Sequence, residues 1–206
     1  MNNSSFKSLS IVTAGLTIGL GLSISQAQSA QASPVNDNVI DALVLDLDTL
    51  INFDNTGATA EAGEVSPGSG TGASTCNSQD GWCSFETNVQ SSIWYSFVAS
   101  EDLFVDFYFT GMDSQAALWE VLDPTDFGTF TEVAANDDSG PVFAPYITPV
   151  SVTQGSTYYL QVDGYSGAEG TGTFIANSTP VPEPAATLGL LALGLLGTTV
   201  LKRKQN

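Results

Sequence analysis

The strongest constraint on the fold is a series of short runs in which apolar and polar residues alternate. Between residues 91 and 176 they recur at a spacing of roughly 10 residues and are separated by turns rich in Gly, Asn and Asp, which is typical of an all-β sandwich. No segment of the central region shows a helical period beyond one turn. The pattern therefore predicts an all-β, antiparallel sandwich. The predicted strands are 93–97, 103–109, 116–122, 131–135, 146–152, 157–163 and 171–176.

Alternation within a run also predicts which side chains face the core. Tyr158, Leu160 and Val162 share one face of their strand. In the run 116–122 we expect Trp119 and Val121 to point inward. Alternating residues at 43–48 predict one further strand, with a solvated face, near the start of the domain.

The first 32 residues have the pattern of a secretory signal peptide. Lys7 is the only charge in the first 36 residues, residues 9–24 are apolar or small, and Ala30 and Ala32 form a small-x-small cleavage pattern. The mature chain is then expected to start at Ser33. The alternative is an uncleaved N-terminal membrane helix, which the short, Gly-rich apolar run disfavours.

The opposite end predicts a membrane segment. Residues 185–201 carry no charge, and as a helix they would span about 25 Å, close to the ~30 Å hydrocarbon core of a bilayer. Lys202, Arg203 and Lys204 follow and should stay cytoplasmic. The predicted organisation is a signal peptide (1–32), a β-sandwich domain (33–180), and a tail (181–206) that contains the transmembrane helix. Residues 178–184 are expected to be a short linker.

The tail resembles a known family signal. Pro182, Glu183 and Pro184, the apolar run and the terminal basic cluster are similar to the PEP-CTERM sorting signal of exported Gram-negative bacterial proteins. The resemblance implies handling by an exosortase, a membrane cysteine protease-transpeptidase, with processing near the Pro-Glu-Pro motif. It also implies a place in the cell envelope, at the cell surface or outside the cell. The alternative is a plain C-terminal membrane anchor.

The charge of the central domain is one-sided. All four basic residues lie at position 7 or at 202–204, the chain has no His, and all but Glu183 of its 22 acidic residues lie between 33 and 180. The domain thus carries 21 carboxylates and no basic side chain. Nucleic acid and anionic lipid headgroups are poor partners for such a surface. It is either a solvated surface that keeps the protein in solution or a surface that needs cations.

Two cysteines, Cys76 and Cys83, flank a short polar loop. In an exported chain they are predicted to form a disulfide that holds down a long loop rich in Gly, Ser and Thr. A redox or metal role would need further ligands such as His, which the chain lacks.

Four stretches in the same order resemble the bacterial pre-peptidase C-terminal (PPC) domain. They cover residues 52–177 and read D-N-T with A-T-A at 54–60, S-I-W-Y-S-F at 92–97, A-N-D-D-S-G at 135–140 and G-S-T-Y-Y-L-Q-V-D-G-Y at 155–165. The resemblance implies a jelly-roll-like β-sandwich, often a non-catalytic module beside secreted proteases, with relatives that bind collagen or calcium. No protease domain precedes it here, which argues against a protease-accessory role.

Catalysis has little support from the residue types. A Ser or Cys nucleophile lacks a His base, and the domain has no Lys. A pair of carboxylates could hydrolyse glycosides, but among so many acids some pair will always be close. Divalent cations such as Ca²⁺ fit better, because they bind carboxylate and amide oxygens. The candidate ligands are Asp54, Asn55, Asn136, Asp137 and Asp138, although residues 136–140 are equally the sequence of a hydrogen-bonded turn.

The sequence thus favours an exported, non-catalytic surface or matrix protein. Aromatic residues near turns, among them Trp82, Tyr146 and Tyr165, suggest exopolysaccharide as a ligand. The alternatives are a secreted hydrolase with a carboxylate pair and the accessory module of a secreted protease. The expected partners are an exosortase-type enzyme and the membrane.

Overall fold

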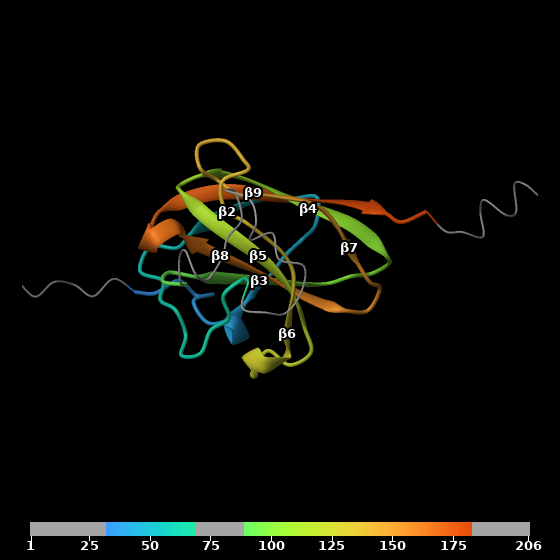
Figure 1. Cartoon of the computed structure of the whole chain (residues 1–206), viewed down its shortest axis with the longest axis horizontal. Helices are drawn as coiled ribbons and strands as arrows, with labels where there is room; N and C mark the ends of the chain where they lie inside the picture. Colours follow the sequence, from blue (N-terminus) through green and yellow to red (C-terminus); the bar gives the residue numbers. More distant parts are fainter. Residues whose placement is uncertain (1–31, 69–88, 183–206) are drawn as a thin grey trace, which may run out of the picture. The chain divides into compact units, whose positions relative to one another are not determined.

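The computed structural model describes residues 32–68 and 89–182, which form two β-sheets that lie face to face (Figure 1). One sheet has the strand order β1-β3-β8-β5-β6 and the other β2-β9-β4-β7. Without β1, the two orders are those of an eight-stranded jelly roll, so the predicted all-β, jelly-roll-like sandwich is confirmed. The elements are η1 (Val39–Asp41), β1 (Leu43–Val44), β2 (Leu50–Asp54), β3 (Ile93–Val98), β4 (Leu103–Gly111), β5 (Ser114–Val121), η2 (Phe127–Thr129), β6 (Phe130–Asn136), β7 (Tyr146–Val152), β8 (Thr157–Gly164), η3 (Tyr165–Gly167) and β9 (Thr171–Pro180).

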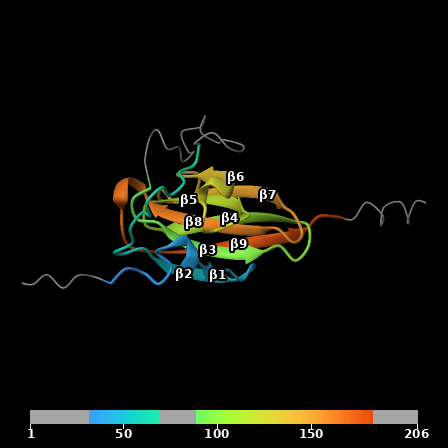
Figure 2. The same cartoon turned by 90° about the horizontal axis from the view of Figure 1, so that it is seen from below.

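Two boundaries differ from the prediction. The run at 43–48 gives only the short strand β1, which pairs in parallel with β3 at the sheet edge, so the sandwich is not wholly antiparallel (Figure 2). Strand β9 continues through Ser178–Pro180, which was predicted to be linker. Its last residues pair with the start of β4, and the Val181 amide donates to the Asp102 carbonyl at 2.9 Å. These main-chain partners explain why a polar stretch without alternation still forms a strand.

Aromatic rings fill the space between the sheets. The Phe174 ring of β9 lies 5.0 Å from the Phe109 ring and 5.1 Å from the Tyr95 ring, measured between centroids. Tyr95 belongs to the opposite sheet, so this cluster joins the two layers. Phe53 packs edge-on to Phe109 and reaches so close to Gly172 that a Cβ at this position would lie 2.4 Å from its ring. Gly172 is therefore required by packing.

A second apolar cluster covers the outer face of the five-stranded sheet. It contains Trp94, Trp119, Val121 and Phe130, whereas Leu118 belongs to the core between the sheets. The expectation that Trp119 and Val121 point into the inter-sheet core is therefore wrong, although both side chains are buried. Alternation predicts that neighbours point to opposite faces, but it does not tell which face lies between the sheets.

The chain between β2 and residue 68 packs over part of this outer face through polar contacts. The Gln161 amide donates to Glu64 Oε1 at 2.8 Å and to the Val65 carbonyl at 3.0 Å, while its oxygen accepts from Trp119 Nε1. Glu64 Oε2 accepts from the Glu61 amide at 2.7 Å. Burial raises the pKa of Glu64 to about 7 against these hydrogen bonds, and the nearby charge of Glu61 adds to the rise.

The raised pKa of Glu64 predicts how stability depends on pH. From its ordinary pKa of 4.5 up to about 7, the native state binds more protons than the unfolded state, so the free energy of unfolding falls as pH rises. The loss is complete above the native pKa and amounts to about 3 kcal/mol. Glu64→Gln, which stays neutral, should flatten this dependence in urea unfolding across this pH range.

The exposed Glu101 provides a matched control, because Glu101→Gln removes the same charge without removing a buried one. It should leave the pH dependence as it is in the parent protein. Equal slopes for the parent and the Glu64→Gln variant would contradict the assignment.

Candidate functional site

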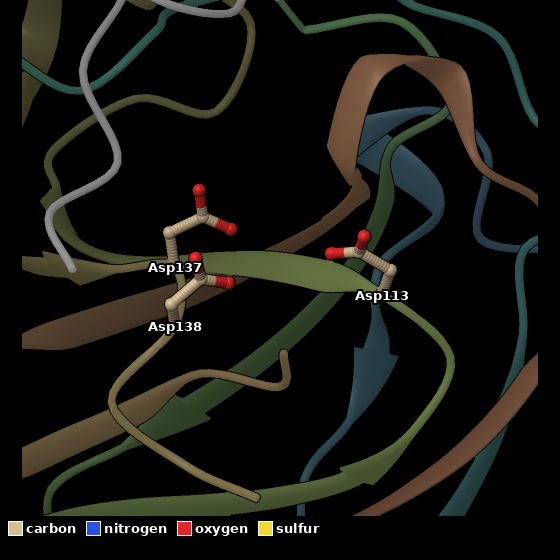
Figure 3. Close-up of side chains that lie close together, drawn as sticks. All are labelled: Asp113, Asp137 and Asp138. Carbon is tan, nitrogen blue, oxygen red and sulfur yellow. The ribbon is translucent and has the colours of Figure 1, made fainter. Parts of the chain in front are cut away.

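Three carboxylates meet at one end of the sandwich. One oxygen each of Asp113, Asp137 and Asp138 lies within 4.8 Å of the others, and Asp113 faces the other two across the gap between their loops (Figure 3). Asp113 directly precedes β5, and Asp137 directly follows β6. These strands are antiparallel neighbours with Ala116 opposite Asn136, so the end of one meets the start of the other. The register therefore creates the cluster.

A small pocket of about 220 Å³ opens at this cluster, lined by Asp113, Asp138, Phe143 and Tyr165. The rings of Phe143 and Tyr165 are exposed. Val142 and Phe143 both have a φ of 59°, in the left-handed region that a β-branched residue such as Val rarely adopts. A strained backbone conformation of this kind persists only where the surrounding structure enforces it. Such conformations are often found near functional sites.

The electrostatics of the cluster favour a proton or a cation. Burial, and then the charge of Asp138, raises the pKa of Asp113. Asp137 is buried and Asp138 half-buried. No basic residue exists between positions 8 and 201 to offset these charges. Carboxylate oxygens at this spacing are the ligands that Ca²⁺ uses, and main-chain carbonyls or water would complete its shell.

The predicted metal ligands separate into two groups. Asp137 and Asp138 lie in the cluster, together with Asp113, which the sequence analysis missed. Asn136 instead holds its own turn: its oxygen accepts from the amides of Ser139 and Tyr146, at 3.2 and 2.8 Å, and its nitrogen donates to Ser139 Oγ. The signal that could have found Asp113 is its place in the short turn between two predicted strands.

Asp54 and Asn55 lie elsewhere. Of the described residues, the group close enough to share one cation comprises the three carboxylates above and not Asp54. Asp54 Oδ1 accepts from the amide and the hydroxyl of Thr56, and these bonds lower the pKa of Asp54. Asn55 is fully buried and serves as a brace: its nitrogen donates to the carbonyls of Ser91 and Ala168, and its oxygen accepts from the Gly170 amide.

A buried carboxylate, Asp163, holds the segment that leads into β3. Asp163 is fully buried at the end of β8, and burial raises its pKa. It accepts from the Ser91 amide at 2.7 Å and from the Gln115 side chain at 2.8 Å. The Ser91 hydroxyl lies 3.4 Å from the same carboxylate, but the chain has no His to link such a pair into a catalytic triad.

The remaining predicted site residues lie outside the described residues. These are Ala30 of the cleavage pattern, Cys76 and Cys83, and the tail residues Glu183, Pro184, Lys202, Arg203 and Lys204. Ala32 and Pro182 are the first and last described residues. Within the described ranges, no helix has the length and apolar character needed to cross a bilayer. The cleavage site, the disulfide and the transmembrane helix therefore stay predictions.

Comparison with known proteins supports the assignment of the tail. Residues 180–204 match the model of the PEP-CTERM protein-sorting motif. This confirms the sorting signal predicted from the Pro-Glu-Pro sequence, the apolar run and the basic end. No curated protein matches the chain.

Among solved structures, the chain is similar to the pre-peptidase C-terminal domain of a collagenase from Bacillus anthracis. The identity is 14%, the TM-score is 0.34, and the match covers 66% of this chain and 94% of that chain. This is the family that the four sequence motifs resemble.

The carboxylate cluster allows the calcium prediction to be tested. If Asp113, Asp137 and Asp138 hold Ca²⁺, millimolar calcium should raise the melting temperature of the exported protein, and at 100 times Kd it should add about 2.7 kcal/mol to the free energy of unfolding. Asp113→Asn and Asp138→Asn should reduce this increment, and Asp54→Asn should not.

Sodium chloride at matched ionic strength provides the control, because screening alone also relieves repulsion among the carboxylates. An equal effect of sodium chloride would show that the acidic surface only needs screening and that the cluster holds no ion.

Proposed function

We propose that this chain is an exported, non-catalytic cell-surface or extracellular-matrix protein that an exosortase-type enzyme processes at its tail. The match of residues 180–204 to the PEP-CTERM sorting motif carries the proposal. That motif is typical of exosortase-targeted proteins of the envelope. The predicted signal peptide at 1–32 supports export, because both ends then direct the domain to the same side of the membrane.

The sorting motif follows the folded domain without an intervening linker. The matched region begins at Pro180, the last residue of β9, and Pro180 is opposite Leu103 in the sheet. The Val181 amide is still bonded to the main chain at Asp102. Processing near Pro182, Glu183 and Pro184 would therefore release or transfer a domain whose last strand is complete.

The residue types support a binding role over catalysis. The domain has neither His nor Lys, so the usual bases for a Ser or Cys nucleophile are missing. The carboxylate pocket is the best candidate for the alternative, a hydrolase with a carboxylate pair, because the raised pKa of Asp113 suits a general acid. Its volume of about 220 Å³ is below the ~300 Å³ typical of small-molecule sites, so it suits an ion better than a sugar chain.

The proposal predicts the mass of the mature protein. In a host with an exosortase, the chain should start near Ser33 and end near Pro182, Glu183 and Pro184, and replacing these three residues by Ala should block the C-terminal processing. Intact-mass spectrometry of the exported protein measures both ends. A mature protein that still ends at Asn206 in such a host would argue against exosortase handling.

Export also predicts the state of the two cysteines. Cys76 and Cys83 should be oxidised in the exported protein and resist alkylation until a reductant is added. The same chain made without its first 32 residues in a reducing cytoplasm provides the control and should alkylate at both positions. Alkylation of the native exported protein would show that the thiols are free.

A further inference from the structure

The outer face of the β2-β9-β4-β7 sheet carries a row of apolar and aromatic side chains across all its strands. The register places Leu50 opposite Ile175, Ile175 opposite Tyr108, and Tyr108 opposite Tyr146. Their neighbours along the strands, such as Phe107, Phe109 and Phe174, point into the core. Leu50 is 61% and Tyr108 42% exposed. We call these four residues the apolar row.

The rings in this row are held in place. Those of Tyr108 and Tyr146 pack edge to face with their centroids 5.9 Å apart. Such packing orders a ring before any ligand arrives, which lowers the entropic cost of binding. No other described element packs over the apolar row enough to bury Leu50 or Tyr108.

A hollow of about 390 Å³ adjoins the row at the β2–β9 end of the face. Its polar lining consists of Asn52, Asp54, Thr171 and Thr173. The register continues this polar line onto β4, where the Thr110 and Thr173 hydroxyls lie 2.9 Å apart. A hydroxyl can donate one and accept two hydrogen bonds, so this pair keeps capacity for a ligand.

The hollow also carries a negative charge. Hydrogen bonds from Thr56 lower the pKa of Asp54, so its carboxylate stays ionised at neutral and mildly acidic pH. Asp106, the next outward residue of β4 on the far side of the row, adds a second carboxylate. With no basic residue in the domain, an anionic polymer would be repelled and a cationic one attracted.

We propose that this face binds a polysaccharide that carries free amino groups. The apolar row would contact the C–H faces of the sugar rings. The Thr and Asn side chains would form hydrogen bonds with the sugar hydroxyl groups, and Asp54 would bind an ammonium group. The proposal rests on the proposed role as a non-catalytic surface protein and names the class of its ligand.

A sugar chain fits this face better than a basic peptide. Strands β9 and β4 are each paired on both sides, so their main chain has no free edge to which an extended peptide could add. A peptide lying across β9 and β4 would have side-chain contacts alone. A sugar polymer, in contrast, presents an apolar face and a hydroxyl edge together, which matches an apolar row beside a polar one.

The test uses the exported protein and an oligomer of β-linked glucosamine, at a mildly acidic pH that keeps its amines protonated. Calorimetry compares this oligomer with its fully N-acetylated form of equal length and with oligolysine. We expect the free-amine sugar to bind and the other two to bind about tenfold more weakly or not at all. Equal binding of oligolysine would show attraction by charge alone and would overturn the proposal, as would no binding of the glucosamine oligomer.

Variants locate the site. Tyr108→Ala and Tyr146→Ala should each weaken binding about tenfold. Tyr165→Ala is the matched control, because Tyr165 is also 42% exposed but lies at the carboxylate pocket, and it should have no effect. Unchanged affinity in both row variants would overturn the proposal. Thermal melting of each variant reports whether it is folded, and Tyr108→Phe should keep the affinity because it keeps the ring.

A second matched pair tests the charge. Asp54 and Asp123 each accept from the amide and hydroxyl of the Thr two residues later. Asp54→Asn should weaken binding about threefold, and Asp123→Asn, which is remote from the hollow, should not. An equal loss in both would show a general charge effect and would overturn the assignment of Asp54. Because processing of the tail is read separately by intact mass, a failure of sugar binding would leave the sorting proposal standing.

Discussion

The absence of any basic side chain between positions 8 and 201 is the constraint to which the rest of the structure conforms. No carboxylate of the domain can form an ion pair within it, so each must face solvent or accept hydrogen bonds from amides and hydroxyls. Such a bond is stronger than one between two neutral groups where it is buried, and water weakens it at the surface. The fold uses them to close its loops: Asp37 accepts from Thr59, Asp48 from Ser178, and Asp126 from the Gly128 amide. The acidic composition is thus partly structural and not only a means of solubility.

The buried carboxylates show the cost of this arrangement. Asp163 is stabilised by the Ser91 amide and the Gln115 side chain, yet burial still raises its pKa. Glu64 is in the same position, with two donors and a raised pKa. Amide donors offset part of the desolvation penalty, but unlike a cation they do not cancel the charge. The native state should therefore gain from conditions that supply protons or cations, which links the pH dependence of Glu64 to the behaviour of the Asp113 cluster.

Alternation of residue type was enough to predict the fold class and most of the strands, because a period of two is a property of each strand alone, but it missed β2. It could not predict pairing. Asp113 joins Asp137 and Asp138 only through the register of β5 and β6. Asp54 lies apart from them, although it also stands beside an Asn in a turn-like sequence. Trp119 was assigned to the wrong face for a related reason, since a second cluster makes both faces of its sheet apolar. The tail was the reverse case. Its motif consists of three sequence parts that follow one another directly, so the sequence alone was enough to find it.

Strand β9 connects the candidate sites with the sorting tail. Its first residue, Thr171, lines the hollow beside Asp54, and its last, Pro180, begins the sorting motif. Ten residues of strand at ~3.4 Å each separate these ends by roughly 30 Å. The carboxylate pocket lies toward the same end as the hollow, because Ser114 of β5 is opposite Gly164 and Gly111 of β4 is opposite Gly172. A domain held through its tail would therefore carry both candidate sites at the end away from its attachment, where a ligand outside the cell reaches them first.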